Sequence, residues 1–130
     1  MKRILLVEDN ELNRELLRAM AEAAGYEVEE AVNGIEALAA LELRLPDLIL
    51  TDLQMPVMSG SVFLQEVRKR PHLARVKVLA VSAFAMRGDR ERALAEGFDG
   101  YLTKPVQKAE FREQIRLLLD TPAAERREAS

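Results

Sequence analysis

The 130-residue sequence contains no cysteine and a single histidine, His72. The lack of cysteine excludes disulfide bridges, thiolate metal sites and cysteine nucleophiles. His72 follows Pro71 in a polar stretch, so we expect it to be an ordinary surface residue rather than a phosphoryl donor. A metal site in this chain would therefore use oxygen ligands.

Long hydrophobic runs are also missing. Lys2 and Arg3 precede an apolar run that stops after Val7, which is too short for a secretory signal. No other run approaches the length that a membrane-spanning helix needs. We therefore expect a soluble, cytoplasmic protein with no membrane partner.

Neither sign of charge is in large excess. The chain has 19 lysines and arginines against 22 aspartates and glutamates, a net charge of -3. Binding to a nucleic-acid backbone normally relies on a broad basic stripe, which this balance does not provide. Nucleic acid is therefore not expected as a direct partner.

The composition that remains is typical of one compact domain, with 48% hydrophobic and 32% charged residues. A chain of this length buries roughly two-thirds of the surface that it exposes when unfolded, which is enough for a stable core. No repeat or linker precedes Thr121, and the polar stretch after Pro122 is typical of a solvated tail. We predict a domain over residues 1–120 and a tail over 121–130, with no output domain.

Short apolar stretches alternate with helical periods along the chain. Continuous apolar runs predict strands that are covered on both faces, as in a parallel sheet, and a weaker alternating run predicts an edge strand. The strands are expected within residues 4–7, 26–31 (the edge), 48–50, 76–81 and 101–102, and the helices within residues 12–24, 35–41, 62–67, 93–94 and 111–119. Five strand–helix alternations indicate an α/β fold with right-handed crossovers.

Polar side chains follow the predicted strands at the points where the strands end. In an open parallel sheet these ends share one edge, where ligands bind. Taken singly, each residue has an ordinary explanation, as a helix cap, a turn residue, a backbone-bonded hydroxyl or a surface lysine. Their convergence predicts a site made of Glu8, Asp9, Asp52, Ser82 and Lys104.

Three neighbouring carboxylates repel one another, and a divalent cation relieves that repulsion. Oxygen ligands in a shallow site suit Mg²⁺ better than Ca²⁺, and the twelve-residue calcium loop is absent. A carboxylate beside Mg²⁺ can attack phosphorus, and Asp52, after the presumed central strand, is the best placed. Lys104 and Ser82 would balance the charge of the resulting acyl phosphate.

These residues, with their neighbours, resemble the receiver domain of two-component response regulators over roughly residues 2–120. The motifs that carry the resemblance are Val7-Glu8-Asp9-Asn10, Asp52 with Met55-Pro56 and Gly60, Ser82-Ala83, and Lys104-Pro105. The segments 8–13 and 83–89 further resemble single-domain, cell-cycle receivers of the DivK kind and receivers attached to hybrid kinases. The implied fold is a flavodoxin-like three-layer sandwich, with a five-stranded parallel sheet in the order 2-1-3-4-5.

The resemblance also implies roles for the site residues. Asp52 would accept a phosphoryl group from a histidine kinase or histidine phosphotransfer protein in a Mg²⁺-dependent reaction, and Ser82 and Lys104 would sense it. Metal ligands would be Asp9 and Asp52 through their side chains, Gln54 through its backbone carbonyl and Glu8 through water. Glu8 and Ser82 stand where receivers more often have Asp and Thr.

The resemblance also implies how the protein changes conformation when it is phosphorylated. The Tyr101 ring would turn inward when Asp52 is phosphorylated, and a downstream protein would contact the fourth helix, fifth strand and fifth helix, beside Phe84, Tyr101 and Phe111. The Lys104–Pro105 peptide bond is expected to be cis. The predicted protein is a signalling switch with only self-phosphorylation and slow self-dephosphorylation chemistry, and not an enzyme that turns over a free substrate.

Two other functions use similar residues. A phosphohydrolase of the haloacid-dehalogenase kind also has an Asp nucleophile at a strand end, but it needs a second Asp two residues later, where this chain has Gln54. Its cap domain would not fit in this length. Flavin binding would need a phosphate-cradling loop after the first strand, where Glu8 and Asp9 repel phosphate. Mass measurement after incubation with acetyl phosphate and Mg²⁺ best separates these possibilities.

Overall fold

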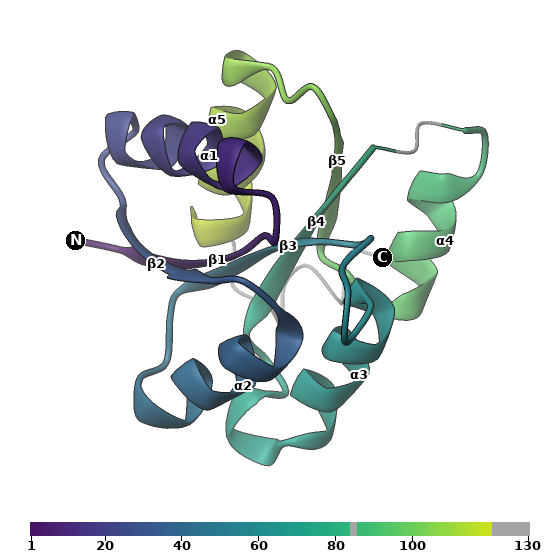
Figure 1. Cartoon of the computed structure of the whole chain (residues 1–130). Helices are drawn as coiled ribbons and strands as arrows, with labels where there is room; N and C mark the ends of the chain where they lie inside the picture. Colours follow the sequence, from purple (N-terminus) through teal and green to yellow (C-terminus); the bar gives the residue numbers. More distant parts are fainter. Residues whose placement is uncertain (84–85, 121–130) are drawn as a thin grey trace.

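The computed structural model describes residues 1–83 and 86–120, within which strands and helices alternate (Figure 1). The predicted solvated tail, 121–130, and Phe84 lie outside the described residues. The elements in chain order are β1 (Arg3–Val7), α1 (Glu11–Ala23), β2 (Glu27–Ala31), α2 (Gly34–Leu43), β3 (Leu48–Asp52), α3 (Gly60–Lys69), a short 3-10 turn (Pro71–Leu73), β4 (Lys77–Ser82), α4 (Asp89–Glu96), β5 (Gly100–Thr103) and α5 (Lys108–Asp120).

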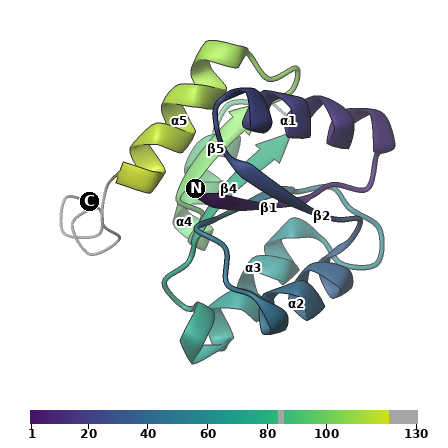
Figure 2. The same ribbon diagram turned by 90° about the vertical axis from the view of Figure 1, so that its left-hand side faces the viewer.

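The sheet is parallel, with the strand order β2-β1-β3-β4-β5. Helices α1 and α5 cover one face, and α2, α3 and α4 cover the other (Figures 1 and 2). This three-layer arrangement confirms the flavodoxin-like fold with the strand order 2-1-3-4-5. Among the described helices, none is both long and apolar enough to cross a membrane.

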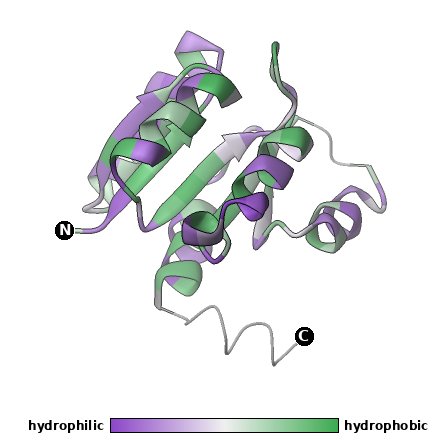
Figure 3. Ribbon diagram, turned by 90° about the horizontal axis from the view of Figure 1, so that it is seen from below, coloured by the Kyte–Doolittle hydropathy of each residue, from purple (hydrophilic) through white to green (hydrophobic). Residues whose placement is uncertain are grey.

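The continuous apolar strands follow from this layering. In β1, Ile4 and Leu6 pack in the core under α1 and α5, while Leu5 and Val7 pack in the core under the other three helices. Both sets of side chains are buried, so alternation between polar and apolar residues is lost. Figure 3 shows hydrophobic residues along the inner strands and both kinds of residue on the helices.

Most of the predicted strand and helix bounds differ from the observed ones, and two differences from the predictions have a clear physical reason. The strand expected over 76–81 is Lys77–Ser82, because the Val76 N–H is used in the preceding turn, where it bonds to the Leu73 carbonyl at 3.1 Å. The placement of Phe111 on the partner-facing surface is wrong. Phe111 is fully buried, since α5 turns it toward the sheet together with Ile115.

Hydrogen bonds at the N-termini of α1, α2 and α3 hold the loops that follow the strands. The side chains of Asn10, Asn33 and Ser59 cap α1, α2 and α3, each accepting a hydrogen bond from the N–H three residues later. Gly60, the first residue of α3, lies so close to the end of β3 that a Cβ atom would meet the Asp52 carbonyl oxygen at 2.6 Å. The helix packs this tightly only because the residue is glycine.

Candidate functional site

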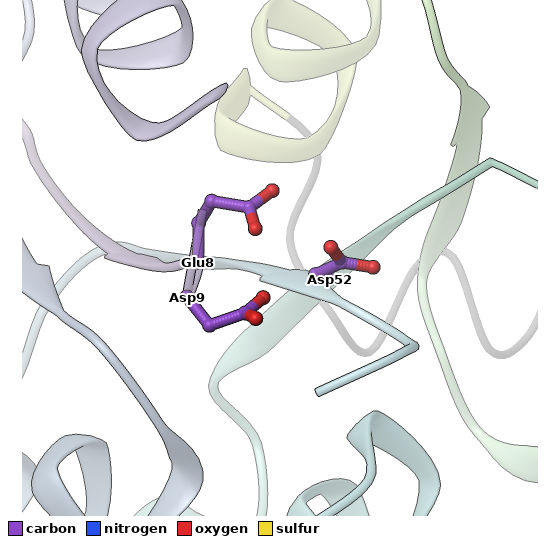
Figure 4. Close-up of side chains that lie close together, drawn as sticks. All are labelled: Glu8, Asp9 and Asp52. Atoms are coloured by element: carbon purple, nitrogen blue, oxygen red, sulfur yellow. The ribbon is translucent and has the colours of Figure 1, made fainter. Parts of the chain in front are cut away.

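The three predicted acidic residues come together at the carboxyl edge of the sheet (Figure 4). Glu8 and Asp9 follow β1, and Asp52 is the last residue of the neighbouring strand β3, which pairs with β1 in parallel. One carboxylate oxygen from each residue lies within 4.8 Å of the other two. Glu8 and Asp52 are buried, and Asp9 is exposed to solvent. The cluster is therefore open to solvent on the side of Asp9.

Lys104 reaches the cluster from the β5 side of the sheet, whereas Glu8 and Asp9 come from β1 on the other side of β3. It follows β5, and its backbone N–H donates to the Ser82 carbonyl at 2.8 Å. Its Nζ donates to Asp52 Oδ2 at 2.7 Å and to Glu8 Oε1 at 2.9 Å. The peptide bond to Pro105 is cis, as the resemblance implied. One ammonium group therefore spans the two buried carboxylates.

The charges at this edge alter one another's ionisation. Burial raises the pKa of Glu8, and the negative charge of Asp52 also raises it, against the hydrogen bonds from Lys104 and the Asn10 N–H. Burial alone would lower the pKa of Lys104, but its hydrogen bonds to Asp52 and Glu8 outweigh burial and raise it. Lys104 therefore stays positively charged at neutral pH.

The donor set fits a hard divalent cation. A single ammonium group faces three carboxylates, and the described residues supply no histidine or cysteine to the cluster. Carboxylate oxygens and the solvent exposure of Asp9 match the preferences of Mg²⁺, which usually keeps several waters. The residues that could hold it through carboxylate oxygens are Glu8, Asp9 and Asp52.

Two further residues belong to the site: Ser82, at the end of β4, and Gln54, in the loop after β3. Ser82 is fully buried at the end of β4, and its Oγ donates to Gln54 Oε1 at 3.1 Å. The Gln54 N–H donates to Asp52 Oδ1 at 3.0 Å. Sequence reasoning assigned only the backbone carbonyl of Gln54 to the site and missed its side chain. Its position two residues after the candidate nucleophile, in the loop after β3, was the available signal.

Arg14 is a second residue that sequence reasoning missed. Its guanidinium donates to the backbone carbonyls of Glu8 at 3.0 Å and Asp9 at 3.4 Å, and it lies 3.7 Å from a Glu30 carboxylate oxygen. It thus ties the acidic loop to α1 and β2. The only signal in the sequence was that Arg14 is a basic residue one turn into the helix that follows Glu8 and Asp9.

Tyr101 lies on β5, three residues before Lys104. Its ring packs in the core under α2, α3 and α4, and only 5% of the residue is exposed. It also borders a hollow of about 390 Å³ between the start of α4 and α5, lined by Met86, Arg87, Gly88, Arg90, Glu91, Tyr101, Thr103 and Glu110. The ring is therefore already inside in this structure.

Comparisons with known proteins agree with this geometry. The family model of the response regulator receiver domain matches residues 4–116. The chain is 42% identical over 118 residues to the polar-differentiation response regulator DivK of Brucella anthropi, covering 91% of this chain and 96% of that protein. The relative is thus similar over almost its whole length.

Solved structures show the same likeness. The receiver domain of a sensor histidine kinase from Pseudomonas aeruginosa PAO1, with a magnesium ion coordinated in its active site cleft, is 36% identical. It has a TM-score of 0.85, covering 92% of this chain and 98% of that one. The chemotaxis response regulator CheY4 of Vibrio cholerae is 30% identical with a TM-score of 0.84, covering 92% and 99%.

The fold and the carboxylate edge define a phosphorylation-dependent signalling domain. The chain belongs to the response regulator receiver family, which confirms the resemblance seen in its motifs. Receiver domains act as switches and interact with histidine kinases and downstream target proteins.

Proposed function

We propose that this chain accepts a phosphoryl group on Asp52 from a histidine kinase or histidine phosphotransfer protein, in a Mg²⁺-dependent reaction. The observation that carries the proposal is the position of Asp52. Its carboxylate is held by Lys104 at 2.7 Å and lies within 4.8 Å of two other carboxylate oxygens at the carboxyl edge of the sheet. The cytoplasm is the proposed site of action, which suits a chain without cysteine.

The residues present can carry out the transfer. An electron pair of the Asp52 carboxylate attacks phosphorus, and the bond to the donor histidine nitrogen breaks with its electrons left on that nitrogen. Mg²⁺, when bound, supplies positive charge beside the phosphoryl oxygens. The Lys104 ammonium then moves from the carboxylates to a phosphoryl oxygen, and the Ser82 hydroxyl donates to another. Slow attack of water on phosphorus would restore Asp52.

The proposed metal ligands rank in a testable order. Asp9 and Asp52 would bind through their side chains and Gln54 through its carbonyl, whereas Glu8 would act through water, as the resemblance to receiver domains implies. We expect Asp9→Asn to weaken Mg²⁺ binding by more than about tenfold and Glu8→Gln to weaken it less. Isothermal titration of each variant with Mg²⁺ measures this difference. Equal losses in the two variants would contradict the ranking.

The proposed receiver occupies residues 1–120, and its output face comprises α4, β5 and α5. Because Tyr101 is already buried, we propose that phosphorylation rearranges the residues that border the hollow beside its ring, and that Ser82 and Tyr101 transmit the change. Such a change needs only a few kcal/mol of difference between two states.

Transmission is testable with beryllofluoride, a mimic of the phosphoryl group. We expect amide shifts to change across residues 86–112 when beryllofluoride and Mg²⁺ are added, because α4 and β5 border the hollow. Nuclear magnetic resonance of labelled protein, with Mg²⁺ alone as the control, measures the shifts. Changes restricted to the neighbourhood of Asp52 would show that this face does not transmit the signal.

A further inference from the structure

The Ser82 hydroxyl has to change its acceptor in the proposed phosphorylation cycle. The Ser82 hydroxyl has a single proton, so it donates one hydrogen bond at a time. In the structure it donates to Gln54 Oε1 at 3.1 Å. In the proposed phosphorylated state it has to donate to a phosphoryl oxygen on Asp52. The two arrangements therefore exclude each other.

Gln54 is placed to hold the unphosphorylated arrangement. Its backbone N–H donates to Asp52 Oδ1 at 3.0 Å, while its side chain accepts from Ser82, 28 positions later in the sequence. It thereby links the loop after β3 to the end of β4. Gln54 itself is exposed, whereas Ser82 is fully buried. Water can therefore replace Ser82 at Gln54 Oε1 once the hydroxyl has turned away.

We propose that the Gln54 side chain is a latch for the unphosphorylated state, which competes with the phosphoryl group for the Ser82 hydroxyl. The inference rests on the proposed function, in which Ser82 contacts the phosphoryl group. Gln54 is a positioning residue here, since its side chain acts through Ser82. Release of the latch removes this side-chain link between the loop after β3 and the end of β4.

The size of the effect follows from the bond that is exchanged. A neutral hydrogen bond that can be replaced by one to water contributes a factor of about two to ten to an equilibrium. Removing the acceptor should therefore favour the phosphoryl-bound arrangement by about this factor. The latch sets the balance between two states and leaves the chemistry at Asp52 in place.

The variant Gln54→Met tests the latch, because methionine keeps the length of the side chain and removes its amide oxygen. We expect beryllofluoride with Mg²⁺ to bind this variant about two to ten times more tightly than the wild type. In metal-free protein, the amide shift of Ser82 should move toward its position in the beryllofluoride complex. Gln65→Met, on the exposed side of α3, is the matched control and should change neither quantity.

The route through Ser82 is tested in a Ser82→Ala background, where Gln54→Met should have no further effect on beryllofluoride affinity. An equal gain in that background would overturn the latch, because Gln54 would then act by another route. Unchanged or weaker binding by Gln54→Met would also overturn it. Failure of the wild type to bind beryllofluoride would instead contradict the proposed function, so the two failures are distinguishable.

Discussion

Asp52→Asn is expected to abolish phosphorylation of this chain by acetyl phosphate and Mg²⁺. The amide oxygen that replaces the carboxylate has no full negative charge and is a poor nucleophile toward phosphorus. The substitution also removes one of the three carboxylates that could hold the metal. Intact-protein mass spectrometry measures the result: the wild type gains the mass of one phosphoryl group, and the variant gains none.

Asp47→Asn is the matched control for this substitution. Asp47 directly precedes β3, the strand that Asp52 ends, so it lies at the opposite edge of the sheet, where it accepts a hydrogen bond from the Arg3 N–H at 2.7 Å. An asparagine oxygen can still accept that bond, and the variant should be phosphorylated like the wild type. A full phosphoryl mass gain in Asp52→Asn would refute the assignment of the nucleophile.

Gly60→Ala is expected to lower the free energy of unfolding by about 2 to 3 kcal/mol, which corresponds to about 10 °C in melting temperature. The added Cβ would lie 2.6 Å from the Asp52 carbonyl oxygen and 2.8 Å from the Leu53 Cα, both backbone atoms. Either α3 moves away from the sheet or the end of β3 moves. Thermal and urea unfolding followed by circular dichroism measures the loss.

Gly34→Ala is a close control, because Gly34 begins α2 as Gly60 begins α3. Its added Cβ would meet Met58, nearest at the sulfur atom at 2.7 Å. That flexible side chain can move aside, so the loss should stay below about 1 kcal/mol. Equal losses in the two variants would show that the backbone at the end of β3 does not set the cost.

The sequence predicted the layered α/β fold because apolar runs such as residues 4–7 are continuous. Such runs occur where both faces of a strand are covered. The apolar pattern did not give the strand boundaries: Val76 is apolar like most of the strand that follows, but its N–H is bonded in a turn. The spacing of Phe111 and Ile115 indicated a helix but left the direction of its apolar face open. The topology decided that this face lies against the sheet.

The sequence by itself indicated that Glu8, Asp9, Asp52, Ser82 and Lys104 share one site, because the carboxyl ends of parallel strands lie at one edge of the sheet. Only the tertiary structure decided the contacts among them. Lys104 reaches Glu8 and Asp52, 96 and 52 positions away, because strand order and register bring the ends of β1, β3 and β5 within the length of one lysine side chain. The bond from Ser82 to Gln54 likewise depends on where a loop places a side chain. No local pattern encodes that distance, since it is set by packing between segments far apart in the chain.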